Sequence, residues 1–167
     1  MSRRFIISDQ HFWHEKAILY NARPFSSVEE MNRKMIINHN NVVKNRDVCF
    51  FLGDFSFCPN DMTREVYEQL NGTKILILGN HDRRKSVTWW RRAGFEEIHK
   101  YPLIINDRFI LSHEPVEGDL GKFYNIHGHI HLNRSDVTTD RHVNVCVETT
   151  GYCPVNLDQL MDFILKG

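Results

Sequence analysis

Short apolar runs separated by polar turns organise the first half of the chain. Each run ends at polar residues, as a buried strand does. Between the first two runs, Ser27 and Glu30 form a capping box, and apolar residues then recur at helical spacing. The pattern predicts strands over residues 4–8, 47–53 and 74–78, helices over 27 to about 44 and over 61–70, and a short helix through Trp89 and Trp90 to Gly94.

The second half is richer in strands. Turn residues such as Asn106-Asp107 separate its short apolar segments. Strands are expected over residues 96–100, 103–105, 109–112, 124–127 and 143–147, followed by a closing helix over 157–165. Strand–helix alternation followed by strand-rich sequence predicts an α/β fold with two sheets flanked by helices.

Length and charge narrow the function classes. The 167 residues fit one domain, so we expect a single domain over 1–167 with no separate cap domain. Twenty-one basic residues balance 21 acidic ones, and the pI is near 7.2. This balance argues against tight binding of long nucleic acids, which usually requires a basic surplus. A nucleotide or a short oligonucleotide remains a suitable substrate.

The four cysteines form no C-x-x-C pair, and two of them lie in strand-like apolar runs, as small buried thiols do. Unpaired cysteines suit a reducing compartment. The first apolar run is too short for a signal peptide, and no stretch reaches membrane-spanning length. We therefore expect a cytoplasmic protein that does not associate with a membrane. Its oligomeric state is left open.

Polar side chains that can bind metals follow the apolar runs. Three runs of the first half end in Asp9-Gln10-His11, in Gly53-Asp54 and in Gly79-Asn80-His81-Asp82. In α/β sheets, ligands collect in the crevice beyond the carboxyl ends of the strands. The second half adds Ser112-His113 and His127-Gly128-His129-Ile130-His131, also at predicted strand ends. Adjacent strands would bring these five segments together.

Spacing supports this interpretation. Residues two apart in extended backbone point to the same side, so Asp9 and His11 can face one metal ion, as can His129 and His131. The glycines of these segments allow sharp turns and a close approach to an ion. Each segment alone is common by chance. Five of them in order, each at a strand end, indicate one metal centre.

The ordered series Asp-x-His, Gly-Asp, Gly-Asn-His-Asp, His and Gly-His-x-His resembles the calcineurin-like metallophosphoesterase superfamily. Residues 7–14, followed by Arg23-Pro24-Phe25, resemble a small single-domain bacterial and phage branch, from which Gln10 departs at a position that is not a ligand. The resemblance implies two mixed β-sheets packed face to face and flanked by helices. Such a four-layer α-β-β-α sandwich has its metal site at the strand carboxyl ends.

The resemblance also implies roles for individual residues. The first metal would be held by Asp9, His11 and His131, and the second by Asn80, His113 and His129, with Asp54 bridging both. His81 would face the substrate, and Asp82 behind it would fix its orientation. Two divalent ions would share a hydroxide that attacks phosphorus in line, with His81 as general acid. A ligand set without cysteine favours Mn²⁺, with Fe²⁺ or Zn²⁺ as alternatives.

Three further residues are substrate-binding candidates. His14 and Arg23 follow the first segment and could wall the substrate pocket, with Arg23 as a phosphate clamp. A surface position for both is an equal alternative. His127 could line the site or simply pack. The basic run 83–85 with Trp89 could hold a nucleotide, although packing of the tryptophans is the favoured interpretation.

Several function classes remain to be compared. The metallo-β-lactamase pattern H-x-H-x-D-H fails, because His131 is followed by Leu132-Asn133, and an amidohydrolase would carry H-x-H on its first strand. A short chain without a cap should leave the metal cleft open, which favours a phosphodiester such as a nucleotide. The alternatives are a phosphomonoesterase or protein phosphatase, a nuclease acting on DNA, and a catalytically weak metal-binding scaffold.

Overall fold

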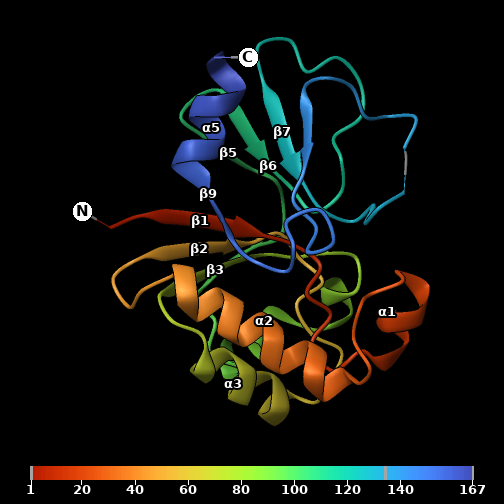
Figure 1. Ribbon diagram of the computed structural model, residues 1–167. Coiled ribbons are helices and arrows are strands. Elements are labelled where there is room, and N and C mark those ends of the chain that lie inside the picture. The colour runs from red at the N-terminus through yellow and green to blue at the C-terminus, as the bar shows by residue number, and fades with distance from the viewer. Residues whose placement is uncertain (1, 134, 167) are drawn as a thin grey trace.

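Three strands of the first half of the chain and two of the second half build a mainly parallel sheet. The computed structural model describes residues 2–133 and 135–166 (Figure 1). The first sheet has the order β4-β3-β2-β1-β9, and all its neighbouring strands are parallel except β1 and β9. Its strands are β1 (Arg4–Ile7), β2 (Val48–Phe51), β3 (Thr73–Ile77), β4 (Glu97–His99) and β9 (Val155–Asn156).

The second half builds a second mixed sheet of order β5-β6-β7-β8. Only the pair β5 and β6 is antiparallel. The strands are β5 (Leu103–Ile105), β6 (Phe109–Leu111), β7 (Tyr124–His127) and β8 (His142–Asn144). Two mixed sheets flanked by helices confirm the expected fold class.

Alternate side chains of β1 divide the interior into two cores, because successive residues of a strand point to opposite faces. Phe5 and Ile7 pack with the helices, while Ile6 packs with β6, β7 and Leu157. Figure 1 shows α2 and α3 below the first sheet and α5 with the second sheet above it. The helices are α1 (Glu15–Tyr20), α2 (Val28–Val42), α3 (Asn60–Gln69), α4 (Val87–Arg92), α5 (Leu157–Lys166) and the 3₁₀ turn η1 (Asp82–Arg84).

Helix α1, strand β9 and the 3₁₀ turn η1 were not predicted from the pattern. Helix α1 has no side-chain cap at His14 and buries only Ala17, so it carries no local signal. Strand β9 is two residues long and exists through its pairing with β1, which is a contact distant in sequence. The predicted strand over 143–147 is shorter, because β8 ends at Asn144.

Other local predictions hold. The Ser27 hydroxyl accepts the backbone N–H of Glu30 at 3.1 Å and caps α2, as the capping box predicts, but the Glu30 carboxylate accepts the backbone N–H of Ser26 (2.8 Å) where the box predicts that of Ser27. Cys49 and Cys146 are buried, and all four cysteines are free thiols. Within the described residues, no helix combines the length and the apolar character that crossing a membrane requires.

Candidate metal centre

The segments that follow β1, β2 and β3 meet at one edge of the first sheet. The backbone N–H of Asp9 donates to the Gly53 carbonyl at 3.1 Å, and that of His11 donates to the Asp54 carbonyl at 2.9 Å. The second sheet joins at the same place, because the backbone N–H of His129 donates to the Asp9 carboxylate at 2.8 Å. Segments distant in sequence therefore form one site.

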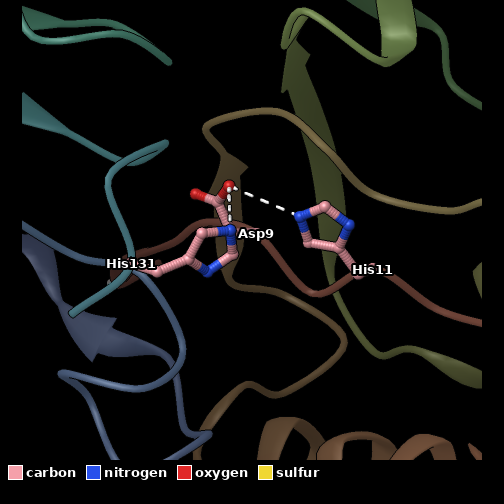
Figure 2. Close-up of side chains that lie close together, drawn as sticks. All are labelled: Asp9, His11 and His131. Carbon is pink, nitrogen blue, oxygen red and sulfur yellow. Dashed lines mark ion pairs between the residues drawn. The ribbon is translucent and has the colours of Figure 1, made fainter. Parts of the chain in front are cut away.

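Asp9, His11 and His131 form the first cluster (Figure 2). Asp9 Oδ1 lies 3.7 Å from His11 Nε2 and 3.8 Å from His131 Nε2. Asp9 Oδ1 and His11 Nε2 are buried and have no hydrogen-bond partner among the described residues. Ligand atoms each about 2.1 Å from one ion are separated by roughly 3–4 Å, so this cluster fits a divalent metal.

The second cluster surrounds His113. Its Nε2 lies 2.9 Å from Asn80 Oδ1 and 3.2 Å from His129 Nδ1. Asp54 Oδ2 is 3.6 Å from His113 Nε2 and also 3.7 Å from His11 Nε2. The Asp54 carboxylate therefore stands between the two clusters, as a bridging ligand would. All seven residues predicted to bind metal lie in these two clusters.

Hydrogen bonds on the far side of two imidazoles turn their Nε2 lone pairs toward the site. His113 Nδ1 donates to the Leu52 carbonyl at 2.7 Å, and His131 Nδ1 lies 3.0 Å from a Glu148 carboxylate oxygen. Such bonds fix the tautomer that a metal requires. Burial, the largest single influence, lowers the pKa of His131, but the hydrogen bond with Glu148 and the charges of Asp9 and Glu148 together raise it above its usual value.

The charge of the Asp9 carboxylate and its unpartnered oxygen suit a cation. Burial alone would raise its pKa, but the neighbouring imidazoles, His11 first, hold the pKa of this carboxyl well below its usual range. The second oxygen, Oδ2, accepts the Ser8 hydroxyl at 2.6 Å in addition to the His129 N–H. Oδ1 is thus the free atom, and it points between the two histidines in Figure 2.

Backbone strain concentrates at these residues. Asp9, His11, Asp54, His129 and His131 all have positive φ, between 50° and 70°. The left-handed region costs a residue with a side chain on the order of 1 kcal/mol or more, and it persists only where the surroundings impose it. A Cβ on Gly128 would overlap Ser8 Oγ and Asp9 Oδ2, so this glycine is required by close packing.

His81 lies at the rim of the centre. Its side chain is 32% exposed, and its Nε2 is 3.8 Å from Asp54 Oδ2. We expected Asp82 to orient this ring, but His81 Nδ1 has no hydrogen-bond partner in the described part of the chain. The buried Asp82 carboxylate instead accepts three backbone N–H groups, those of Asp54 (2.7 Å), Gly79 (3.0 Å) and Phe55 (3.2 Å).

Asp82 therefore positions the loop that carries Asp54 and not the imidazole of His81. Burial, and next the charge of Asp54, raise the pKa of Asp82 to about 7. Asp82 lies next to Asp54 and Gly79, but the direction of a side chain on a 3₁₀ turn depends on contacts that spacing does not show.

The prediction that Arg23 clamps a phosphate is wrong. Arg23 is only 4% exposed, and its guanidinium donates to the backbone carbonyls of Asp9 (2.7 Å) and Gln10 (2.8 Å) and to Glu148 (2.9 Å). It therefore braces the first ligand loop from behind. Its partner Glu148, which also contacts His131, was missed. A signal existed, because Glu148 follows the apolar run 143–147 as Asp9 follows its own run.

The other two candidates for substrate binding, His14 and His127, lie in different places. His14 stays at the rim, where its ring stacks on Phe57 at a centroid distance of 4.0 Å and its Nδ1 lies 3.2 Å from His11 Nδ1. Half-exposed Phe57 was not predicted, since a lone phenylalanine carries no sequence signal. His127 is buried, and its Nδ1 donates to the Gly128 carbonyl at 2.8 Å. His127 therefore packs behind the site, which was one of its two expected roles.

Comparison with known proteins gives a consistent result. The family model described as calcineurin-like phosphoesterase matches residues 3–159. An uncharacterized protein of Methanocaldococcus jannaschii is 38% identical, over 100% of this chain and 94% of the relative. A protein of unknown function from Aquifex aeolicus has a similar structure, with a TM-score of 0.77 and 26% identity over 98% of this chain and 100% of the other.

A more distant structure, a Pseudomonas putida nuclease, has a TM-score of 0.54 and 18% identity, over 77% of this chain and 62% of the nuclease. At this identity the likeness concerns the fold.

Proposed function

The chain belongs to the calcineurin-like phosphoesterase family, and from this we propose that it is a two-metal phosphodiesterase acting on a nucleotide-type substrate. The observation that carries the proposal is the position of the Asp54 carboxylate. Its Oδ2 lies 3.7 Å from His11 Nε2 and 3.6 Å from His113 Nε2, so one carboxylate serves two clusters. The unpartnered Asp9 Oδ1 and His11 Nε2 support the same proposal.

Asp9, His11 and His131 would hold one ion and Asn80, His113 and His129 the other, with Asp54 shared by both. When bound, two divalent ions supply positive charge and an acidified water for in-line attack on phosphorus. The oxygen and nitrogen ligands favour Mn²⁺, with Fe²⁺ or Zn²⁺ as alternatives.

His81 is the proposed general acid. Its side chain is partly exposed, and its Nε2 faces the centre 3.8 Å from Asp54 Oδ2. A proton held at Nε2 can pass to the leaving oxygen, which is typically worth about 10²- to 10⁴-fold in rate. His14 and Phe57 form an aromatic wall beside this position, with centroids of 4.0 Å between each other and 4.7 Å between Phe57 and His81.

Two cavities border segments that carry candidate ligands, and this space favours a diester. One cavity, of about 600 Å³, is lined by His129 and by Glu114, the neighbour of His113. Another, of about 630 Å³, is lined by Leu78, which directly precedes the Gly79-Asn80-His81 segment. A diester has a substituent on each side of phosphorus, whereas a monoester requires only one.

The decisive test compares metal-stripped protein, supplemented with Mn²⁺, on bis(p-nitrophenyl) phosphate and on p-nitrophenyl phosphate. We expect the wild-type protein to hydrolyse the diester faster than the monoester. The Asp54→Asn variant should lose both metals and its activity. The His81→Gln variant should keep its metal content but turn over at least about 100-fold more slowly. Asp162→Asn, an exposed carboxylate on α5, is the matched control. Preference for the monoester would replace the diester assignment, and an unaltered metal content in Asp54→Asn would refute the shared-carboxylate model.

A further inference from the structure

A basic cavity lies one strand further along the edge that carries the metal centre. This cavity of about 630 Å³ is lined by residues at the ends of β3 and β4 and by the turn after His81, among them Leu78, Arg83, Lys85, Lys100 and Tyr101. The proposed function uses this cavity only as space for a substituent and assigns no role to its basic or aromatic side chains.

The sheet topology fixes the position of this cavity relative to the metals. Asp9, Asp54 and Asn80 follow β1, β2 and β3, and the sheet continues to β4. The backbone N–H of Leu78 donates to the His99 carbonyl at 2.9 Å, so Lys100 lies beside the start of the segment that carries Asn80. Leu78 and Arg83 line the cavity and flank residues 79–82, so the cavity adjoins the segment that carries Asn80 and His81.

The charge of the cavity is positive although the whole chain is neutral. Arg83, Lys85 and Lys100 line it, and no carboxylate does so among the described residues. Arg83 contacts Glu114 at 3.3 Å, but both side chains are nearly half exposed, which makes this pair weak. Within residues 2–133 and 135–166, Lys85 and Lys100 have no acidic partner within 4.0 Å.

Aromatic side chains accompany these cations. Lys85 Nζ lies 4.7 Å from the centroid of the Trp89 ring, which holds the ammonium in place without neutralising it. Tyr101 is 78% exposed at the rim and offers a free face. Cations along a groove combined with an exposed ring are the elements that bind single-stranded nucleotides through phosphate contacts and stacking.

We propose that this cavity is an anion subsite that binds a phosphate group of the substrate adjacent to the phosphodiester being cleaved. The inference rests on the proposed function and narrows its substrate class to molecules with at least two phosphate groups. Two sources share this chemistry, namely a short single-stranded oligonucleotide and a nucleoside polyphosphate. Lys85 and Lys100 are the contacts that the proposal requires, and Tyr101 stacks on the base.

The test uses the Lys85→Gln/Lys100→Gln double variant. Its matched control is Lys34→Gln/Arg46→Gln, which removes the same charge from exposed positions on α2 and before the amino end of β2. KM is measured with Mn²⁺ for a single-stranded tetranucleotide, for a nucleoside triphosphate and for bis(p-nitrophenyl) phosphate, which has one phosphate. In parallel, anisotropy of a labelled tetranucleotide measures binding without metal.

In the Lys85→Gln/Lys100→Gln variant only, we expect KM for the preferred substrate, either the tetranucleotide or the nucleoside triphosphate, to rise at least 10-fold more than KM for bis(p-nitrophenyl) phosphate. If the tetranucleotide is preferred, the slope of log affinity against log salt should decrease in magnitude by about 1.4, because each lysine that neutralises a phosphate accounts for about 0.7. Equal effects on all three substrates, or equal effects of both double variants, would overturn the subsite. Wild-type protein that hydrolyses no diester defeats the proposed function, and the metal-free anisotropy then decides the subsite alone.

Discussion

Acidification should destabilise this protein through His39, a residue remote from the metal centre. His39 lies in α2 with 3% of its surface exposed and stacks on Phe51 of the first sheet at 5.8 Å. Its Nε2 donates to the Asn71 carbonyl at 2.9 Å. Burial lowers the pKa of His39 from 6.5 to about 4, although the Asn71 carbonyl opposes this shift.

The direction in which pH changes the free energy of unfolding follows from proton linkage. An unfolded chain protonates His39 near pH 6.5, whereas the folded chain resists protonation until about pH 4. The stabilising contribution is therefore complete above pH 6.5 and is lost as the pH falls toward 4. With 1.36 kcal/mol for each pKa unit, the loss is roughly 2 kcal/mol at pH 5 and about 3 kcal/mol at pH 4.

His39→Gln isolates this contribution, because the glutamine amide can donate to Asn71 but does not titrate. Free energies of unfolding are measured by urea denaturation in EDTA at pH 7.5 and pH 5.0 for both proteins. The wild type should lose about 2 kcal/mol more than the variant between the two pH values. Histidines at the metal centre affect both proteins alike and cancel. Equal losses would show that His39 titrates at its ordinary pKa, which contradicts the role given to its burial.

Three substitutions test how the metal centre is supported. Glu148→Gln removes the carboxylate that contacts His131, so the affinity for Mn²⁺ measured by titration calorimetry should weaken about 10- to 100-fold. An unchanged affinity would show that Glu148 does not support the metal centre. Gly128→Ala forces a methyl group onto Ser8 Oγ and Asp9 Oδ2, and bound Mn²⁺ measured by elemental analysis should fall, whereas full occupancy would contradict the close packing. Asp82→Ala leaves three backbone N–H groups without their acceptor and should cost at least about 1–3 kcal/mol in urea unfolding, while an undiminished midpoint would exclude this bracing role.

Local pattern predicted what depends on neighbouring residues in sequence. The strands that precede Asp9, Asp54 and Asn80 are continuous apolar runs, so their ends could be located without a structure. Their convergence could be expected because carboxyl ends of parallel strands share one edge. Helix α1 could not be predicted, since it has no side-chain cap and buries only Ala17, and strand β9 could not be predicted because it is two residues long and depends on its pairing with β1.

The site residues also differ in how far the sequence alone could identify them. Residue type and spacing indicated the five metal-binding segments, because metal binding requires particular side chains, and the family resemblance then implied the seven candidate ligands within them. Arg23 shows the limit, since a guanidinium suits a phosphate and a buried carboxylate equally, and only tertiary contacts decide between them. Its position between the Asp9 carbonyl and Glu148 arises from segments 125 residues apart, which no local pattern contains.

The junction of the two sheets explains why the strained geometry of the centre persists. Ser8 at the end of β1 forms a bridge with Cys146 beyond β8, and the N–H of His129 donates to Asp9. Each sheet thus contributes candidate ligands, and each holds the other's candidate ligand segments in place. The core beneath contains Ile6, Phe50 and Ile126, which join the two sheets directly. A shift of one sheet would separate His113, His129 and His131 from Asp9 and Asp54 together, so the integrity of this core sets the geometry of both clusters at once.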